Sequence, residues 1–108
     1  NNNISHFEGF YASVVYSYLA GSGLDIIAED VTKRGNIDLT IKIQENIYVV
    51  EFKVTNKKEK TNIALQQIKD RKYHLKYISE DKNIYLVGIV FNEEAKNIDG
   101  FEWERVES

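Results

Sequence analysis

Three charged residues on two consecutive β-prone segments have the types and spacing of a small metal-dependent active site. Asp38 lies in the first segment, residues 36–43, and Glu51 and Lys53 lie in the second, residues 47–55. Alternate residues of a strand share one face, so Glu51 and Lys53 project together. Two carboxylates beside an ammonium form a hard oxygen site that suits Mg²⁺ or Mn²⁺. Such an ion lowers the pKa of a bound water and neutralises a scissile phosphate, while Lys53 orients the water or stabilises developing charge.

The hydrophobic pattern of the two segments predicts how they pair. A two-residue turn at residues 45–46 sets Leu39 opposite Phe52, apolar on apolar. The same register sets Asp38 opposite Lys53, with the second carboxylate one diagonal step away. Strict alternation then places four apolar residues on the other face of the first segment: Ile37, Leu39, Ile41 and Ile43.

A second interpretation of the same three charges needs no metal. Carboxylates and an ammonium on neighbouring strands also form ordinary cross-strand salt bridges on a solvated sheet face. Under that interpretation, neutralising Asp38, Glu51 and Lys53 together costs little and removes no activity. The strand pattern by itself leaves both interpretations open.

The segments that must position these charges follow an α-β-β-β-α-β order. Periodic apolar residues and turn signals predict two helices and four strands, with a further edge strand at residues 100–106: helices 5–20 and 61–78, and strands 25–32, 36–43, 47–55 and 83–91. Strand 83–91 is apolar on both sides, as is typical of a central strand. We therefore expect an α/β fold with a mixed sheet flanked by two helices.

The two predicted helices have recognisable ends and apolar faces. Ser5 is a favourable N-cap for the first helix, and the glycines at 21 and 23 stop it. Its apolar stripe comprises Phe7, Phe10, Tyr11, Val14, Val15 and Tyr18. The expected core contacts of the second helix are Ala64, Leu65, Ile68 and Leu75.

Composition limits the class of protein. The chain has 108 residues, which suffices for one domain with one core, and it contains no cysteine and no membrane-length apolar run. We expect a cytoplasmic protein without a membrane partner. The chain begins with three asparagines and has no methionine, so we expect residues 1–108 to be one domain cut from a longer protein.

Charge is distributed unevenly along the chain. The net charge is −3, but basic residues are concentrated between positions 53 and 76. Six of them are candidates for contacting nucleic acid: Lys57, Lys58, Lys60, Lys69, Arg71 and Lys72. A solvated helix face is the alternative explanation for the same residues.

The combined motifs resemble the PD-(D/E)xK nuclease superfamily. The stretch from Gly35 to Leu39 (GNIDL), followed by residues 49–53 (VVEFK), is similar to its D…ExK signature, and the element order resembles its restriction-endonuclease-like αβββαβ core. Ile37 replaces the proline of the family name. More narrowly, four stretches resemble the C-terminal nuclease-like domain of a prokaryotic family with an AAA-type ATPase in front: FEGFYASVVYSYLAG, GNIDLTI, YVVEFKV and ALQQIKDRKY.

The resemblance implies roles for particular residues. Asp38 and Glu51 would bind the metal, with the backbone carbonyl of Phe52 as a third ligand, and Lys53 would be the catalytic lysine. Glu8 matches an acidic residue that the superfamily often carries on its first helix near the metal. Gln67 matches a polar residue that often lies near the site, which gives a catalytic set of Asp38, Glu51, Lys53 and Gln67.

The implied function is a Mg²⁺- or Mn²⁺-dependent endonuclease or exonuclease that acts on DNA, with RNA as the less favoured substrate. The rival hypothesis is a catalytically silent nuclease-like module that binds nucleic acid or a partner and regulates an attached N-terminal ATPase domain. A homodimer is compatible with either function.

Local sequence leaves two of these roles with alternatives. Ser5 and Glu8 also fit a capping box, in which the glutamate bonds the Ser5 backbone rather than a metal. Gln66 adjoins Gln67, and because one helical step is about 100°, only one of them faces the site; we favour Gln67. Tyr73 is expected to be a packing aromatic rather than a ligand.

Overall fold

The computed structural model describes residues 2–58 and 60–107, with side chains from residue 12 onward. The structure contains two α-helices, two short 3₁₀ segments and five strands. In chain order they are α1 (Asn2–Gly21), β1 (Asp25–Thr32), β2 (Gly35–Ile43), β3 (Asn46–Thr55), α2 (Ile63–Arg71), η1 (Tyr73–Lys76), η2 (Ile78–Glu80), β4 (Asn83–Asn92) and β5 (Asn97–Arg105).

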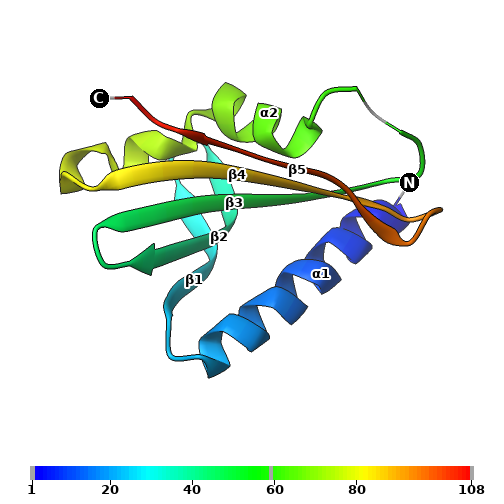
Figure 1. Cartoon of the computed structure of the whole chain (residues 1–108), viewed down its shortest axis with the longest axis horizontal. Helices are drawn as coiled ribbons and strands as arrows, with labels where there is room; N and C mark the ends of the chain where they lie inside the picture. The colour runs from blue at the N-terminus through cyan, green and yellow to red at the C-terminus, as the bar shows by residue number, and fades with distance from the viewer. Residues whose placement is uncertain (1, 59, 108) are drawn as a thin grey trace.

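The strands form one mixed sheet in the order β1-β2-β3-β4-β5. β1, β2 and β3 are antiparallel neighbours, β3 and β4 are parallel, and β5 returns antiparallel to β4. The parallel pair requires a crossover, and α2 supplies it. Figure 1 shows α1 and α2 on opposite sides of the sheet. The predicted α/β class, the mixed sheet with two flanking helices and the edge strand are therefore confirmed.

Each face of the sheet has its own apolar cluster. On the α2 side the buried cluster contains Ile37, Ile47, Val49, Leu65, Ile68, Tyr73, Tyr77, Ile84 and Leu86. On the α1 side it is built around Leu39, Val50 and Phe52, with Ala12 and Val15 of the helix packed against it. Alternation along β3 therefore sends Val49 to α2 and Val50 to α1, which also places Glu51 and Lys53 on the α2 side.

The structure corrects two predictions about α1. The helix begins at Asn2, so Ser5 lies inside it and is not its N-cap, and the capping-box alternative for Glu8 loses its premise. Among the described side chains of the predicted apolar stripe, Val14 is 51% exposed and Tyr18 is 76% exposed, whereas Val15 packs against the α1-side cluster. The side chains of Phe7, Phe10 and Tyr11 lie outside the described residues.

The second helix is shorter than predicted. α2 ends at Arg71, because Lys72 takes the left-handed conformation (φ 54°) and its N–H bonds the carbonyls of Ile68 and Lys69. This turn carries Tyr73 into the core, where it is 2% exposed, as expected for a packing aromatic. Leu75, which a continuous helix would have buried, is 42% exposed on η1 instead.

Candidate active site

The β2–β3 hairpin pairs in a different register from the predicted one. Ile43 lies opposite Asn46 and Leu39 opposite Val50, so the turn is at residues 44–45 and the prediction was wrong by two residues. Gln44 makes this turn by adopting a left-handed φ of 54°. A two-residue shift leaves every side chain on the same face, so apolar still meets apolar and the pattern cannot distinguish the two registers.

The corrected register brings Asp38 to the level of Glu51 rather than Lys53. The backbone ladder runs only as far as the Leu39–Val50 pair, and beyond it side chains bridge the two strands. The Asp38 N–H donates to Glu51 Oε1 at 3.2 Å, and the Phe52 N–H donates to Asp38 Oδ2 at 2.8 Å. The two carboxylates thus occupy the point where β2 and β3 stop pairing.

A break in strand alternation aims Asp38 at this point. β1 and β2 pair at Ala28–Leu39 and at Asp30–Ile37, but the intervening Glu29 has a left-handed φ of 49°. Leu39 belongs to the α1-side cluster and Ile37 to the α2-side cluster, so the expectation that both face one way was wrong. The register is the same on both sides of this point, so neither strand inserts an extra residue, and the break in alternation coincides with the left-handed Glu29.

Gln67 completes the cluster from the helix side. Its Nε2 donates to Glu51 Oε2 at 2.8 Å, over a carboxylate that is only 3% exposed. Gln66 is exposed and donates to Asp70 at 2.8 Å. The preference for Gln67 over Gln66 as the residue that faces the site is therefore confirmed, while its role in catalysis stays a prediction.

Two residues that the sequence interpretation missed hold α2 in place over Glu51. Asn62 caps the helix by accepting the Leu65 N–H at 2.8 Å, and its Nδ2 donates to the Gly88 carbonyl at 2.9 Å. Gly88 pairs with Glu51, and a Cβ there would lie 2.4 Å from the Leu65 nitrogen. The available signals were an N-cap residue before an apolar run and a lone glycine in a buried strand.

The remaining predicted site residues lie nearby or outside the described side chains. Lys53 shares the α2-side face with Glu51 and is partly exposed. The Phe52 side chain is buried in the α1-side cluster, and its N–H is the group that bonds Asp38. The side chain of Glu8 lies outside the described residues, although its backbone belongs to α1.

The donor set fits a hard divalent cation in part. Asp38 and Glu51 supply carboxylate oxygens at one place, the ligand type that Mg²⁺ and Mn²⁺ prefer. Among the side chains that the structure describes, no group of three or more His, Cys, Asp or Glu residues forms a complete metal cage. Two carboxylates beside backbone oxygens and water are compatible with Mg²⁺, which commonly uses one or two protein carboxylates.

The six basic residues predicted to contact nucleic acid lie on two consecutive segments of the chain. Lys57, Lys58 and Lys60 are exposed on the segment that follows β3. The other three lie on or directly after α2: Lys69, Arg71 and Lys72. Lys69 is engaged with Glu104 of β5 at 3.0 Å, whereas the Arg71 guanidinium donates to the Arg34 carbonyl at 3.2 Å.

A second buried carboxylate cluster was not predicted from the sequence. Asp30 is 3% exposed and accepts hydrogen bonds from Thr40 at 2.7 Å, from Lys76 and from Tyr77. Burial raises the pKa of Asp30, but the bonds from Lys76, Tyr77 and Thr40 outweigh it and lower the pKa below its ordinary value. Burial, with the bond to Asp30, raises the pKa of the Tyr77 hydroxyl.

Comparison with known proteins points to one family. A family model described as the PD-(D/E)XK nuclease superfamily matches residues 6–101. An uncharacterized protein in the vnfD 5′ region of Azotobacter chroococcum mcd 1 is 42% identical over 101 residues, which is 94% of this chain. The chain spans only 19% of that relative's length. No solved structure matches. No helix in the described part of the chain is long and apolar enough to cross a membrane.

Proposed function

Because the chain belongs to the PD-(D/E)XK nuclease superfamily, we propose that it is a metal-dependent nuclease that hydrolyses phosphodiester bonds in DNA. The observation that supports this most directly is the hydrogen-bonded trio of Asp38, Glu51 and Gln67 at the end of the β2–β3 ladder. RNA is the less favoured substrate.

We assign the metal to Asp38 and Glu51. Nucleases of this superfamily generally use divalent metals, and the two carboxylates favour Mg²⁺ or Mn²⁺. The bound ion would supply an acidified water and charge neutralisation at the phosphate. The Phe52 carbonyl and the Glu8 carboxylate remain candidate additional ligands.

The chain's own residues then have separate tasks. Lys53, on the face shared with Glu51, would orient the attacking water or stabilise negative charge that develops on the phosphate. Gln67 holds one oxygen of Glu51 and thereby fixes which way the other points. Burial of Glu51 keeps bulk water from competing for the carboxylate, which strengthens its attraction for a cation.

Cleavage of fluorescently labelled DNA, with Mg²⁺, Mn²⁺ or EDTA, tests the assignment. We expect wild-type cleavage that EDTA abolishes, and loss of that cleavage in Asp38→Ala and Lys53→Ala. Matched controls are Asp25→Ala and Lys82→Ala, which remove exposed charges of the same kind on β1 and directly before β4. Circular dichroism establishes that all four variants are folded. Unchanged cleavage in both site variants would rule out the mechanism.

Mn²⁺ titration separates the enzyme from the silent module. Saturable binding that Asp38→Ala removes and Asp25→Ala retains supports the nuclease. Retained DNA binding without any Mn²⁺ binding supports a module in which the basic residues of α2 and the preceding loop matter more than the acidic pair.

We further propose that residues 1–108 form the C-terminal nuclease-like domain of a longer cytoplasmic polypeptide with an ATPase domain in front. The motif resemblance and the greater length of the Azotobacter relative support this. ATP hydrolysis by the complete polypeptide, measured with and without DNA, tests it.

A further inference from the structure

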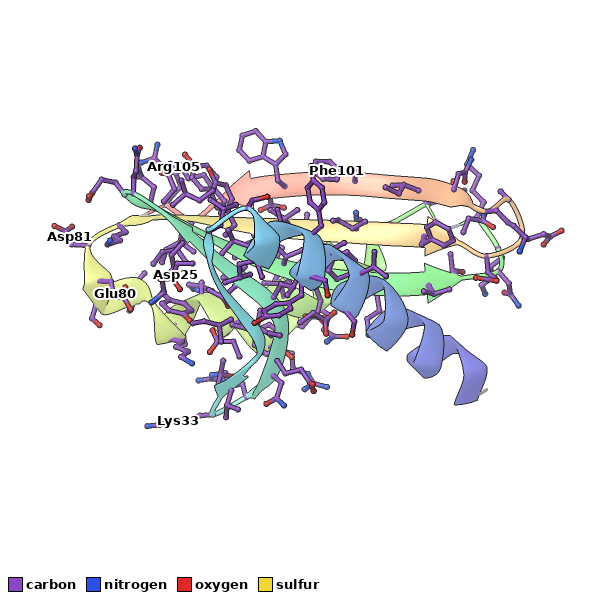
Figure 2. The ribbon with its side chains drawn as sticks, turned by 90° about the horizontal axis from the view of Figure 1, so that it is seen from below. Asp25, Lys33, Glu80, Asp81, Phe101 and Arg105 are labelled. Atoms are coloured by element: carbon purple, nitrogen blue, oxygen red, sulfur yellow. The ribbon has the colours of Figure 1, made fainter. Side chains whose placement is uncertain are left out.

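A basic pocket lies between the β1–β2 turn and η1, outside the carboxylate cluster. Its volume is about 620 Å³, and it is lined by Val31, Thr32, Lys33, Arg34, Lys72, Tyr73, Leu75 and Lys76. None of these eight residues is acidic and four are cationic. Figure 2 shows Lys33 at the outer tip of the β1–β2 hairpin, far from Arg105 and Phe101 on β5.

Hydrogen bonds between side chains and backbone groups hold the hairpin side of the pocket in a fixed shape. The Arg71 guanidinium donates to the Arg34 carbonyl at 3.2 Å, and the Lys76 ammonium donates to the Val31 carbonyl at 2.7 Å. Thr32 closes the turn by donating to the Gly35 carbonyl at 2.6 Å and accepting the Arg34 N–H at 3.0 Å. The turn therefore has a fixed conformation before a ligand binds, so binding costs little conformational entropy.

Three cations of the pocket have no ion-pair partner among the described residues: Lys33, Arg34 and Lys72. Several other basic residues share this property, but these three line one concavity from two separate elements. Cations that converge in this way favour an anionic ligand. Lys76 is already engaged with Asp30 and serves the scaffold.

The pocket adjoins the carboxylate cluster through two elements. Arg34 of the pocket is four residues before Asp38, a separation of about 13 Å at about 3.3 Å per residue. Lys72 of the pocket follows Gln67 by five residues, about 7.5 Å farther along the helix axis. A duplex strand rises about 3.4 Å per nucleotide, so a strand at the cluster would reach the pocket within about four nucleotides.

We propose that this pocket binds the phosphodiester backbone of the substrate strand beside the cleaved bond, through Lys33, Arg34 and Lys72. The inference rests on the proposed nuclease function and adds the β1–β2 hairpin to the substrate-binding surface. Val31 and Leu75 supply apolar walls against which the adjoining sugar packs.

The test compares two double variants that remove equal charge. Lys33→Ala/Arg34→Ala removes two cationic side chains from the pocket but keeps the backbone groups that form the turn. Lys82→Ala/Lys96→Asn is the control; both residues are exposed, and Asn tolerates the left-handed φ of Lys96. Binding of a 5′-fluorescein 20-nucleotide DNA, single-stranded or duplex, is measured by anisotropy in EDTA over a salt series, after thermal melts show that both variants are folded.

We expect the pocket variant to bind about 10-fold more weakly than wild type and to show a salt slope smaller by about 1.4 to 1.8, the value for two lost phosphate contacts. The control should match wild type in both. Equal affinity and slope for the two variants would overturn the pocket assignment. Loss of binding to thymidine 5′-monophosphate without loss of DNA affinity would overturn it as well, because the pocket would then hold a free nucleotide.

Cleavage by wild type distinguishes the two proposals. If wild type cleaves DNA and the pocket variant binds and cleaves as well as the control, the pocket assignment fails while the nuclease stands. If wild type fails to cleave with every metal but the pocket variant still loses DNA affinity, the nuclease fails and the pocket remains a phosphate-backbone site.

Discussion

Two carboxylate clusters, centred on the buried residues Asp30 and Glu51, lie on the α2 side of the same sheet, and they differ in what donates to them. Asp30 accepts from a lysine ammonium and from the hydroxyls of Thr40 and Tyr77. The donors described at Asp38 and Glu51 are amide N–H groups, among them Gln67 Nε2. The first cluster contains a lysine ammonium, and the second contains two carboxylates that share one end of the β2–β3 ladder with these amide groups.

We expect the first cluster to act mainly in stability and the second in the proposed cleavage. Burial raises the pKa of Asp30, but the bonds from Lys76, Tyr77 and Thr40 outweigh it and hold this carboxylate within the fold. Amide donors orient the carboxylates of Asp38 and Glu51, and carboxylate oxygens are the ligands that a hard divalent cation prefers. Sequence position gives no hint of the difference, because Asp30, Asp38 and Glu51 are all acids within strands.

The largest expected effect is on the chemistry of the amide-bonded cluster. Glu51→Gln keeps the shape of the side chain and removes its charge, so we expect cleavage to fall by two to three orders of magnitude. The free energy of unfolding should change far less than in an Asp30 variant. Cleavage assays and urea denaturation of the same preparation measure the cleavage rate and the free energy of unfolding. A Glu51→Gln protein that cleaves normally would contradict the assignment of chemistry to this cluster.

The opposite result is expected for Asp30→Ala. Removing this acceptor leaves the Tyr77 and Thr40 hydroxyls without their hydrogen bonds and Lys76 without its ion-pair partner. The free energy of unfolding should therefore fall by about 3 kcal/mol. Cleavage per folded molecule should persist at temperatures where the variant is folded. Loss of catalysis without loss of stability would place Asp30 in the active site.

The position of α2 over the amide-bonded cluster can be disturbed at Gly88. In Gly88→Ala the new Cβ would lie 2.4 Å from the backbone nitrogen of Leu65, so α2 must shift. We expect the free energy of unfolding to fall by about 2 kcal/mol. We also expect lower activity, because Gln67 would move away from Glu51. Gly100→Ala on β5 is the matched control, because its nearest contact would be an ordinary 3.4 Å. Equal stability of the two variants in thermal melts would show that the close approach of Gly88 to the α2 backbone does not fix the position of the helix.

Gln67→Ala should have a smaller and more selective effect. Loss of the bond to Glu51 leaves the carboxylate less well oriented, and we expect about 10-fold weaker Mn²⁺ binding or slower cleavage. Gln66→Ala removes an exposed bond to Asp70 and should behave like wild type. If both glutamine variants weaken Mn²⁺ binding equally, Gln67 has no special relation to the site.

The smallest effect concerns pH and the Asp30 cluster. The pKa of Asp30 lies below its ordinary 3.8, so at low pH the folded state binds fewer protons than the unfolded state. The stabilisation is therefore complete above about pH 4 and is lost as pH falls through the lower folded-state value. The stability gap between wild type and Asp30→Ala should narrow below pH 4 in urea titrations, and a gap that widens there would reverse the assigned shift.

The fold was largely predictable from local pattern, and the errors have common causes. Strands of alternating or continuous apolar residues gave the sheet, but the two-residue register error left every face unchanged and so was invisible to hydrophobicity. α2 was predicted too long because Lys72 is an ordinary helix former whose left-handed turn depends on burying Tyr73. Neither error altered which elements surround the site.

The sequence by itself determined the element order, the two-faced β3 strand and the presence of Asp38, Glu51, Lys53 and Gln67 on elements that must pack together. These depend on side-chain periodicity, which is local. Only the tertiary structure decided that Asp38 meets Glu51 rather than Lys53, and that Asp30 acquires a lysine. Those outcomes accompany left-handed residues at Glu29, Gln44 and Lys72, a conformation that few residues other than glycine adopt and that side-chain periodicity does not predict.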